Sequence, residues 1–137
     1  MAIHGMIDLE TLDTRPEAVV LTVGAIKFDP FTREDPHSEM YYRLDADTQA
    51  MAGRTVDDRT VEWWGKQPQE VWQEALGDDN RTYVADFIRD LQKWLVGVEV
   101  VWAQGYGFDM TILENLLRMF GHNVPCFNLC HRILARL

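Results

Sequence analysis

Short apolar runs separated by polar turns dominate the first third of the chain. Apolar and β-branched residues are concentrated at positions 2–9, 18–28 and 41–44. The segment 13–16 (Asp-Thr-Arg-Pro) lies between the first two runs, and an Asp-Pro pair at 29–30 closes the second. Such residues are typical of turns. Runs of this length with short polar connections predict three antiparallel strands.

The periodicity changes after residue 60. Apolar positions recur at helical spacing in residues 60–64, 68–76, 83–95 and 109–120, and a short strand pattern at 98–103 precedes the last of these. Asn80 or Thr82 is expected to cap the helix at 83–95, and Gly121 to end the helix at 109–120. This order predicts an α/β fold with a mixed sheet, in which a helical crossover brings the later strand into the sheet.

Composition indicates one globular domain over residues 1–137. Hydrophobic residues make up 47% and charged residues 26% of the chain, which suits a buried core. The formal charge of −9 argues against binding nucleic acid or anionic membranes through bulk charge, but not against an enzyme that recruits divalent cations with clustered carboxylates. No apolar run approaches the ~20 residues that span a bilayer. The two cysteines are too few for a disulfide scaffold, so a cytoplasmic setting is expected.

Two carboxylates stand out at the end of the first predicted strand. Asp8 and Glu10 are two positions apart, so alternation along a strand sends both side chains to one face while Leu9 packs on the other. Adjacent like charges raise each other's pKa unless a cation lies between them. The spacing alone is also that of ordinary solvated residues at a strand end, and both interpretations stay open on this motif.

A third carboxylate follows the later strand. Asp109 comes after a glycine-containing turn and begins the predicted helix at 109–120. One interpretation is an N-cap, because the side chain of Asp accepts hydrogen bonds from free backbone N–H groups. The other is a ligand-binding residue, since open α/β sheets bind ligands at the carboxyl ends of their strands.

Three segments together resemble a known family. They are 6–12 (MIDLETL), 60–64 (TVEWW) with Gln67, and 102–105 (WAQG) with Phe108 and Asp109. The combination resembles the DEDD superfamily of 3'–5' exonucleases, which has an RNase H-like fold, and within it the phage and bacterial exonuclease VIII-like and exoribonuclease-like branch. The resemblance implies a mixed sheet with flanking helices and hydrolysis of phosphodiester bonds at the 3' ends of single-stranded DNA or RNA.

The resemblance also implies roles for individual residues. Asp8, Glu10 and Asp109 match the carboxylates that hold two Mg²⁺ or Mn²⁺ ions in the family, a donor set suited to hard cations. The backbone at Thr11 and Leu12 is expected to seat the terminal nucleotide. Trp64, beside the family-like Gln67, is the best candidate among the tryptophans for stacking on a base, although aromatic residues at helical spacing more often belong to the core.

The sequence departs from the family near its C-terminus. The family places a histidine base and a fourth carboxylate in an H-x-x-x-x-D motif on a later helix, and neither His122 nor His131 is followed by Asp at that spacing. We therefore expect a domain without the final helix of the family, through a frameshift, an early stop or natural variation. The alternative function is a catalytically silent module that binds a protein partner or nucleic acid, and a weaker one is a structural RNase H-like domain.

The C-terminal residues carry two further predictions. Without the final helix, residues 127–137 are expected to cover the sheet face near Asp8 and Asp109, or the chain to form a homo-oligomer through it. Cys126 and Cys130 are expected to be free thiols, because with His122 and His131 they form no clear zinc-binding frame.

Overall fold

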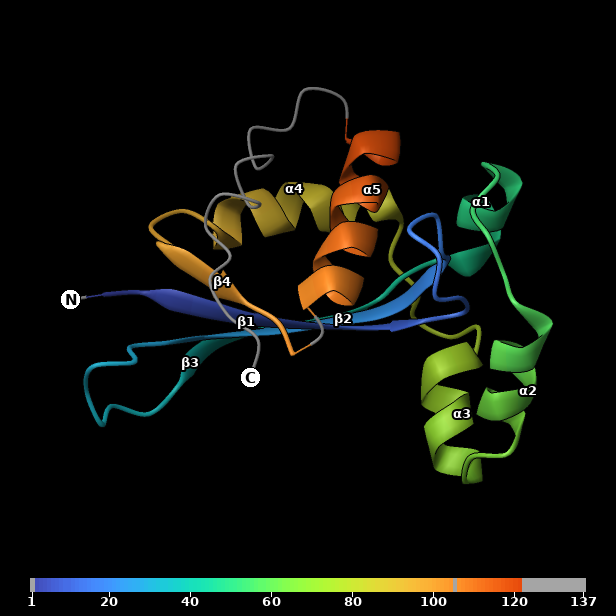
Figure 1. Cartoon of the computed structure of the whole chain (residues 1–137), viewed down its shortest axis with the longest axis horizontal. Coiled ribbons are helices and arrows are strands. Elements are labelled where there is room, and N and C mark those ends of the chain that lie inside the picture. Colours follow the sequence, from blue (N-terminus) through green and yellow to red (C-terminus); the bar gives the residue numbers. More distant parts are fainter. Residues whose placement is uncertain (1, 105, 122–137) are drawn as a thin grey trace.

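Four strands form one mixed sheet in the order β3-β2-β1-β4 in the computed structural model, which describes residues 2–104 and 106–121 (Figure 1). The strands are β1 (His4–Thr11), β2 (Val20–Phe28), β3 (His37–Arg43) and β4 (Val100–Trp102). The first three are antiparallel neighbours, and β4 pairs with β1 in parallel. The predicted α/β architecture with an antiparallel meander and a later parallel strand is confirmed.

The helices lie on one face of the sheet and at one end of it. α4 (Val84–Trp94) and α5 (Thr111–Phe120) cover one face, whereas α1 (Ala46–Met51), α2 (Asp58–Gly65) and α3 (Gln69–Leu76) gather at the end of the sheet away from the N-terminus (Figure 1). A short π-helical turn, η1 (Tyr106–Met110), leads directly into α5. Along the chain α4 directly precedes β4, so it belongs to the helical crossover that connects β3 with β4.

Alternation along β1 divides the sheet into a buried and an open face. Ile7 and Leu9 are buried in the main core, while Asp8 and Glu10, which alternate with them, are exposed. The apolar sides of α4 and α5 cover the Ile7 face, and removal of these side chains from water stabilises the layered arrangement. A second, smaller core cluster lies beside α2 and α3 and consists of Leu12, Val19, Leu21, Trp64 and Ala75.

Three details of the predicted elements are wrong. β3 begins at His37, four residues before the predicted start, because its polar residues pair with β2 while their side chains remain in solvent. α1 was not predicted, since its only buried residue is polar: Gln49 accepts a hydrogen bond from the Val20 N–H and donates one to the Val20 carbonyl, both 2.8 Å long. Neither Asn80 nor Thr82 caps α4, which begins after Tyr83 without a side-chain cap.

Several predictions fall outside the described residues. His122, Cys126, Cys130, His131 and the segment 127–137 are not described, so the free thiols, the covering of the sheet face and the homo-oligomer stay predictions. Gly121 is the C-cap of α5, as expected. None of the described helices is long and apolar enough to cross a membrane.

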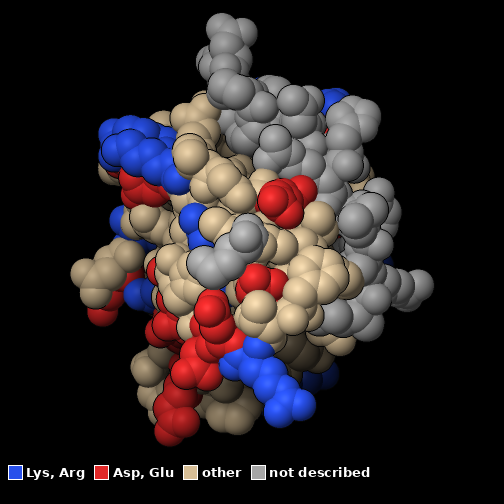
Figure 2. Space-filling view, turned by 90° about the vertical axis from the view of Figure 1, so that its left-hand side faces the viewer, with Lys and Arg blue, Asp and Glu red and all other residues tan. Residues whose placement is uncertain are grey.

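The charge distribution agrees with the acidic composition. On the face that Figure 2 shows, acidic side chains gather in a band, and the described Lys and Arg residues stand in separate groups rather than in one continuous basic surface. A polyanionic ligand would therefore find little general attraction on this face, so a local feature of the molecule has to supply any affinity for phosphate.

Candidate active site

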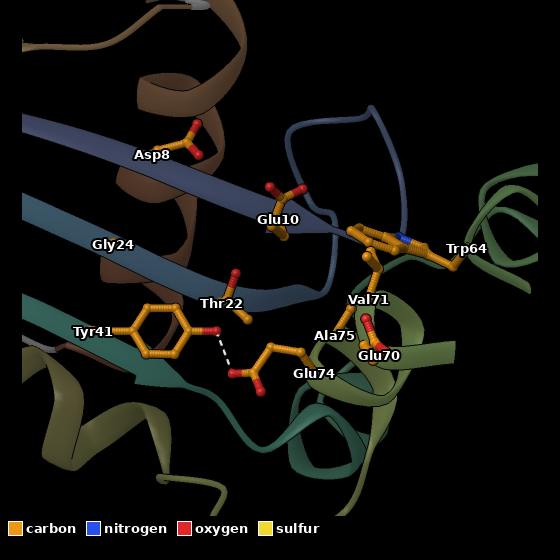
Figure 3. A pocket seen from close by; sticks show the side chains of 10 residues that line it. All are labelled: Asp8, Glu10, Thr22, Gly24, Tyr41, Trp64, Glu70, Val71, Glu74 and Ala75. Atoms are coloured by element: carbon orange, nitrogen blue, oxygen red, sulfur yellow. Dashed lines mark hydrogen bonds between the residues drawn. The ribbon is translucent and has the colours of Figure 1, made fainter. Parts of the chain in front are cut away.

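Asp8 and Glu10 occupy neighbouring rows of the open sheet face. In the β1–β2 register Asp8 lies opposite Gly24 and Glu10 opposite Thr22, and in the β2–β3 register Gly24 lies opposite Tyr41. The two carboxylates point to the same side of β1, which Figure 3 shows directly. Partial burial and then the neighbouring charge of Asp8 raise the pKa of Glu10 above its ordinary value. The predicted pairing of the two side chains on one face is therefore present.

Asp109 reaches the same place from a different element. It lies in the π-helical turn η1, and its residue is only 4% exposed. Burial raises its pKa to about 7, and the charges of Asp8 and Glu10 and a hydrogen bond with Asp8 act in the same direction. The N-cap position of α5 belongs to Met110, which makes no side-chain cap. The N-cap interpretation of Asp109 is therefore wrong, and the structure brings Asp109 within electrostatic reach of both β1 carboxylates.

The chemistry of these three side chains suits a divalent cation. All three supply hard oxygen donors, which Mg²⁺ and Mn²⁺ prefer. Burial is the main cause of the raised pKa values of Glu10 and Asp109, and a cation would relieve the charge repulsion that adds to it. As the side chains stand, no group of three or more His, Cys, Asp or Glu residues in 2–104 and 106–121 is arranged to hold a metal ion. The assignment of these residues as metal ligands stays a prediction that rests on donor type and electrostatic coupling.

A pocket of about 410 Å³ opens beside the carboxylates (Figure 3). Its floor is the open face of β1, β2 and β3, and its far wall is formed by α2 and α3. The lining residues are Asp8, Glu10, Thr22, Gly24, Tyr41, Trp64, Glu70, Val71, Glu74 and Ala75. A second hollow of about 400 Å³ shares Asp8, Gly24 and Tyr41 with the first. A ligand bound at Asp8 and Glu10 therefore has room for an adjoining group on the same face.

Comparison with known proteins identifies the family. A protein-family model described as the 3'-5' exoribonuclease Rv2179c-like domain matches residues 3–135, nearly the whole chain. The chain belongs to this family. In the comparison with curated proteins, no protein matches the chain significantly.

Solved structures with a similar fold include complexes of a bacterial exonuclease. This exoribonuclease-like domain is similar to E. coli exonuclease I in a metal-free complex with single-stranded DNA (15% identity, TM-score 0.61) and in a complex with a 5cy-dA13 oligonucleotide (17%, 0.60). A zinc-bound form of the exonuclease I–DNA complex gives 16% identity and a TM-score of 0.61. Each match covers 100% of this chain and 28% of the exonuclease I chain. At these identities the likeness establishes the fold.

The predicted nucleotide-binding residues of the exoribonuclease-like domain are engaged within the protein. Trp64 is 4% exposed, and its Nε1 donates a hydrogen bond of 3.0 Å to the carbonyl oxygen of Thr11. The backbone N–H of Leu12 donates to the Val19 carbonyl over 2.9 Å. Trp64 therefore forms part of the pocket wall and fixes the end of β1. Its neighbour Trp63, by contrast, is 54% exposed. Base stacking by Trp64 and nucleotide seating by Thr11 and Leu12 stay predictions.

Sequence reasoning missed the far side of the pocket. Tyr41, Glu70 and Glu74 were not singled out, because Tyr41 looked like an ordinary strand residue and both glutamates looked like solvated positions of a helix. One signal was present in the sequence. Gly24 interrupts the apolar run 18–28, and a glycine inside a strand often marks the close approach of a ligand. In the structure its φ is not positive, so the backbone conformation does not require a glycine there.

Proposed function

We propose that this domain is a metal-dependent 3'–5' exonuclease that hydrolyses the terminal phosphodiester bond of a single strand. The observation that carries the proposal is the contact between two elements: Asp109 in η1 hydrogen-bonds to Asp8 on β1 and feels the charge of Glu10, and Asp8 and Glu10 line the pocket. A buried carboxyl next to two other carboxylates adds little to the stability of a fold, and such an arrangement is typical of a functional site.

The residues of the site have distinct tasks in this proposal. Asp8, Glu10 and Asp109 would hold two Mg²⁺ or Mn²⁺ ions, which when bound supply an activated water and neutralise charge on the phosphate. The buried Asp109 carboxyl would give up its proton when the ions bind. Trp64 holds the Thr11 carbonyl and so fixes the end of β1 that carries Glu10.

Two observations support a single-stranded nucleic acid as the substrate. The family is described as exoribonuclease-like, and the similar exonuclease I structures are complexes with single-stranded DNA. With a net charge of −9 the protein needs bound cations rather than its own surface to attract a polyanion. RNA is the first substrate to test, with DNA of the same sequence beside it.

Labelled single strands test this function. With Mn²⁺ present, a 5'-labelled strand should shorten stepwise, and a 3'-labelled strand should release its label as a mononucleotide. Asp8→Asn and Asp109→Asn should each lower the rate about 100-fold or more, because each removes a predicted metal ligand. Asp78→Asn, at an exposed position outside the pocket, is the matched control and should leave the rate unchanged.

Two outcomes would contradict the proposal. Release of the label from the 5' end first would reverse the direction of degradation. Absence of degradation of RNA and DNA with Mg²⁺ or Mn²⁺, in a folded preparation, would favour the silent nucleic-acid or protein-binding module instead.

A further inference from the structure

The far wall of the pocket presents hydrogen-bond acceptors. Glu70 and Glu74 line it from α3, and Tyr41 lines it from β3 (Figure 3). The Tyr41 hydroxyl donates a hydrogen bond of 2.6 Å to Oε1 of Glu74. Burial and then this bond with Glu74 raise the pKa of Tyr41 to about 12, so the hydroxyl keeps its proton at neutral pH. The one proton that Tyr41 has to donate is therefore already used within the protein.

The remaining polar groups of the wall accept but do not donate. Ionised carboxylates have only acceptor oxygens, and none of the described residues that line the pocket is Lys, Arg, His, Asn or Gln. The Trp64 Nε1–H is used on the Thr11 carbonyl, so among the lining side chains the Thr22 hydroxyl, on the floor next to Glu10, is the donor left. A ligand edge that reaches Glu70 and Glu74 therefore meets acceptors and must itself supply N–H groups.

Glu74 is held in a fixed position. Arg43 on β3 donates to the backbone carbonyls of Glu74 over 2.9 Å, Gly77 over 3.0 Å and Gln73 over 3.2 Å, which ties the C-terminal end of α3 to the sheet. The same guanidinium lies 3.5 Å from Oε1 of Glu74. An acceptor positioned before a ligand arrives costs little further ordering when the ligand binds, so it discriminates well between ligands.

Gly24 leaves space for a flat ring between the carboxylates and this wall. It lies between Asp8 and Tyr41 across the three strands. A Cβ atom built on Gly24 would contact only Tyr41, at 3.9 Å from Cδ1. The surrounding protein atoms therefore do not require a glycine at this position, and its effect is to keep the pocket floor open. The Tyr41 side chain, with its residue 55% exposed, offers an aromatic surface beside that space, and bases stack on such surfaces.

We propose that this pocket receives a base adjoining the scissile phosphate and favours bases that carry an exocyclic amino group over uracil or thymine. The proposal rests on the proposed nuclease function, because the phosphate is placed at Asp8 and Glu10. The amino group of cytosine, adenine or guanine can donate to Glu70 or Glu74. At that position uracil and thymine carry the O4 carbonyl, which finds no donor on this wall and is repelled by the carboxylates. Their one N–H, at N3, can reach a single carboxylate oxygen, whereas an amino group supplies two N–H donors.

Cytosine and uracil give the sharpest test, because they have the same size and differ at one exocyclic group. Initial rates of nucleotide release are compared for oligocytidylate and oligouridylate of equal length with Mn²⁺. The cytidine strand should react about three- to tenfold faster, the factor expected for one hydrogen bond. Glu74→Gln should narrow this ratio, because an amide both donates and accepts. The control Glu62→Gln, at an exposed position on α2 outside the pocket lining, should retain it.

Binding measurements separate the failure of this inference from the failure of the nuclease function. Calorimetric titration with cytidine and uridine monophosphates in Mn²⁺ requires no turnover, and thermal melting shows whether each variant is folded. Tighter binding of the cytidine nucleotide without degradation would support the base preference and contradict the nuclease. The base preference would be overturned by degradation of both strands at equal rates, or by a cytidine preference that Glu74→Gln leaves unchanged in a folded variant. Either result would remain consistent with the proposed nuclease function.

Discussion

At the scale of single residues, Asp109 links the stability of the fold to pH. Its pKa is about 7 in the folded protein against 3.8 for an ordinary Asp. Between these two values the folded state keeps a proton that the unfolded state has lost, so this group contributes stability at low pH that disappears as the pH rises toward 7. Without metal, Asp109→Asn should therefore stabilise the protein relative to wild type at pH 8 and lose that advantage at pH 4.

Urea unfolding of wild type and Asp109→Asn at several pH values measures this difference. Comparing the two proteins at each pH removes the contribution of the other titrating groups. Asp35→Asn, in an exposed loop, is the control and should show no such trend. A difference between wild type and Asp109→Asn that is independent of pH would contradict the raised pKa.

The same residue is predicted to determine the response to metal. Mn²⁺ or Mg²⁺ should raise the thermal midpoint of the wild-type protein, since a ligand that binds only the folded state stabilises it, by about 2.7 kcal/mol at 100 times its dissociation constant. Asp109→Asn should lose most of that rise. Scanning calorimetry with and without the metal tests this, and equal shifts in both proteins would place the ion elsewhere.

At the scale of elements, the sequence predicts what periodicity encodes. The alternation of Ile7, Asp8, Leu9 and Glu10 predicts both the strand and which of its faces is open, because the apolar side must pack against helices. The π-helical turn that carries Asp109 has no such periodic signal. An Asp at the start of a predicted helix also fits an N-cap, so the sequence leaves the role of Asp109 open. The Tyr41–Glu74 contact joins residues 33 positions apart, so it depends on how α3 docks on the sheet rather than on any local pattern.

Trp64 and Trp63 give a matched test of how α2 is attached to β1. Trp64→Phe removes the Nε1 donor and leaves the Thr11 carbonyl without that partner. The free energy of unfolding should fall by about 1 kcal/mol. Trp63→Phe changes a residue that is 54% exposed and should have almost no effect. Urea denaturation of both variants measures the two free energies of unfolding. Equal losses of free energy in the two variants would show that the Trp64 hydrogen bond adds nothing to stability.

At the scale of the whole molecule, stability is distributed unevenly between two cores. Twenty of the described residues form the buried cluster between the sheet, α4 and α5, whereas five form the one beside α2 and α3. Elements that bury little apolar surface open at lower free energies than the global unfolding. The helices α2 and α3 rest on the smaller core, so we expect them to open at a lower free energy than the rest of the fold, although Arg43 fixes Glu74 while α3 is docked.

Native-state hydrogen exchange should reveal this division. Amides of α2 and α3 should exchange faster than those of α5 and the central strands β1 and β2. Arg81 ties α3 to the sheet, because its guanidinium donates to the carbonyls of Gly77 over 2.7 Å, Ala75 over 2.5 Å and Leu21 over 3.0 Å. Arg81→Lys keeps the charge but loses the planar fork of donors. It should speed exchange in α3 and leave the slowest amides of α5 unchanged once global stability is accounted for. If α3 and α5 instead exchange with one common free energy in both proteins, the molecule opens only as a single unit and the pocket wall is as rigid as the core.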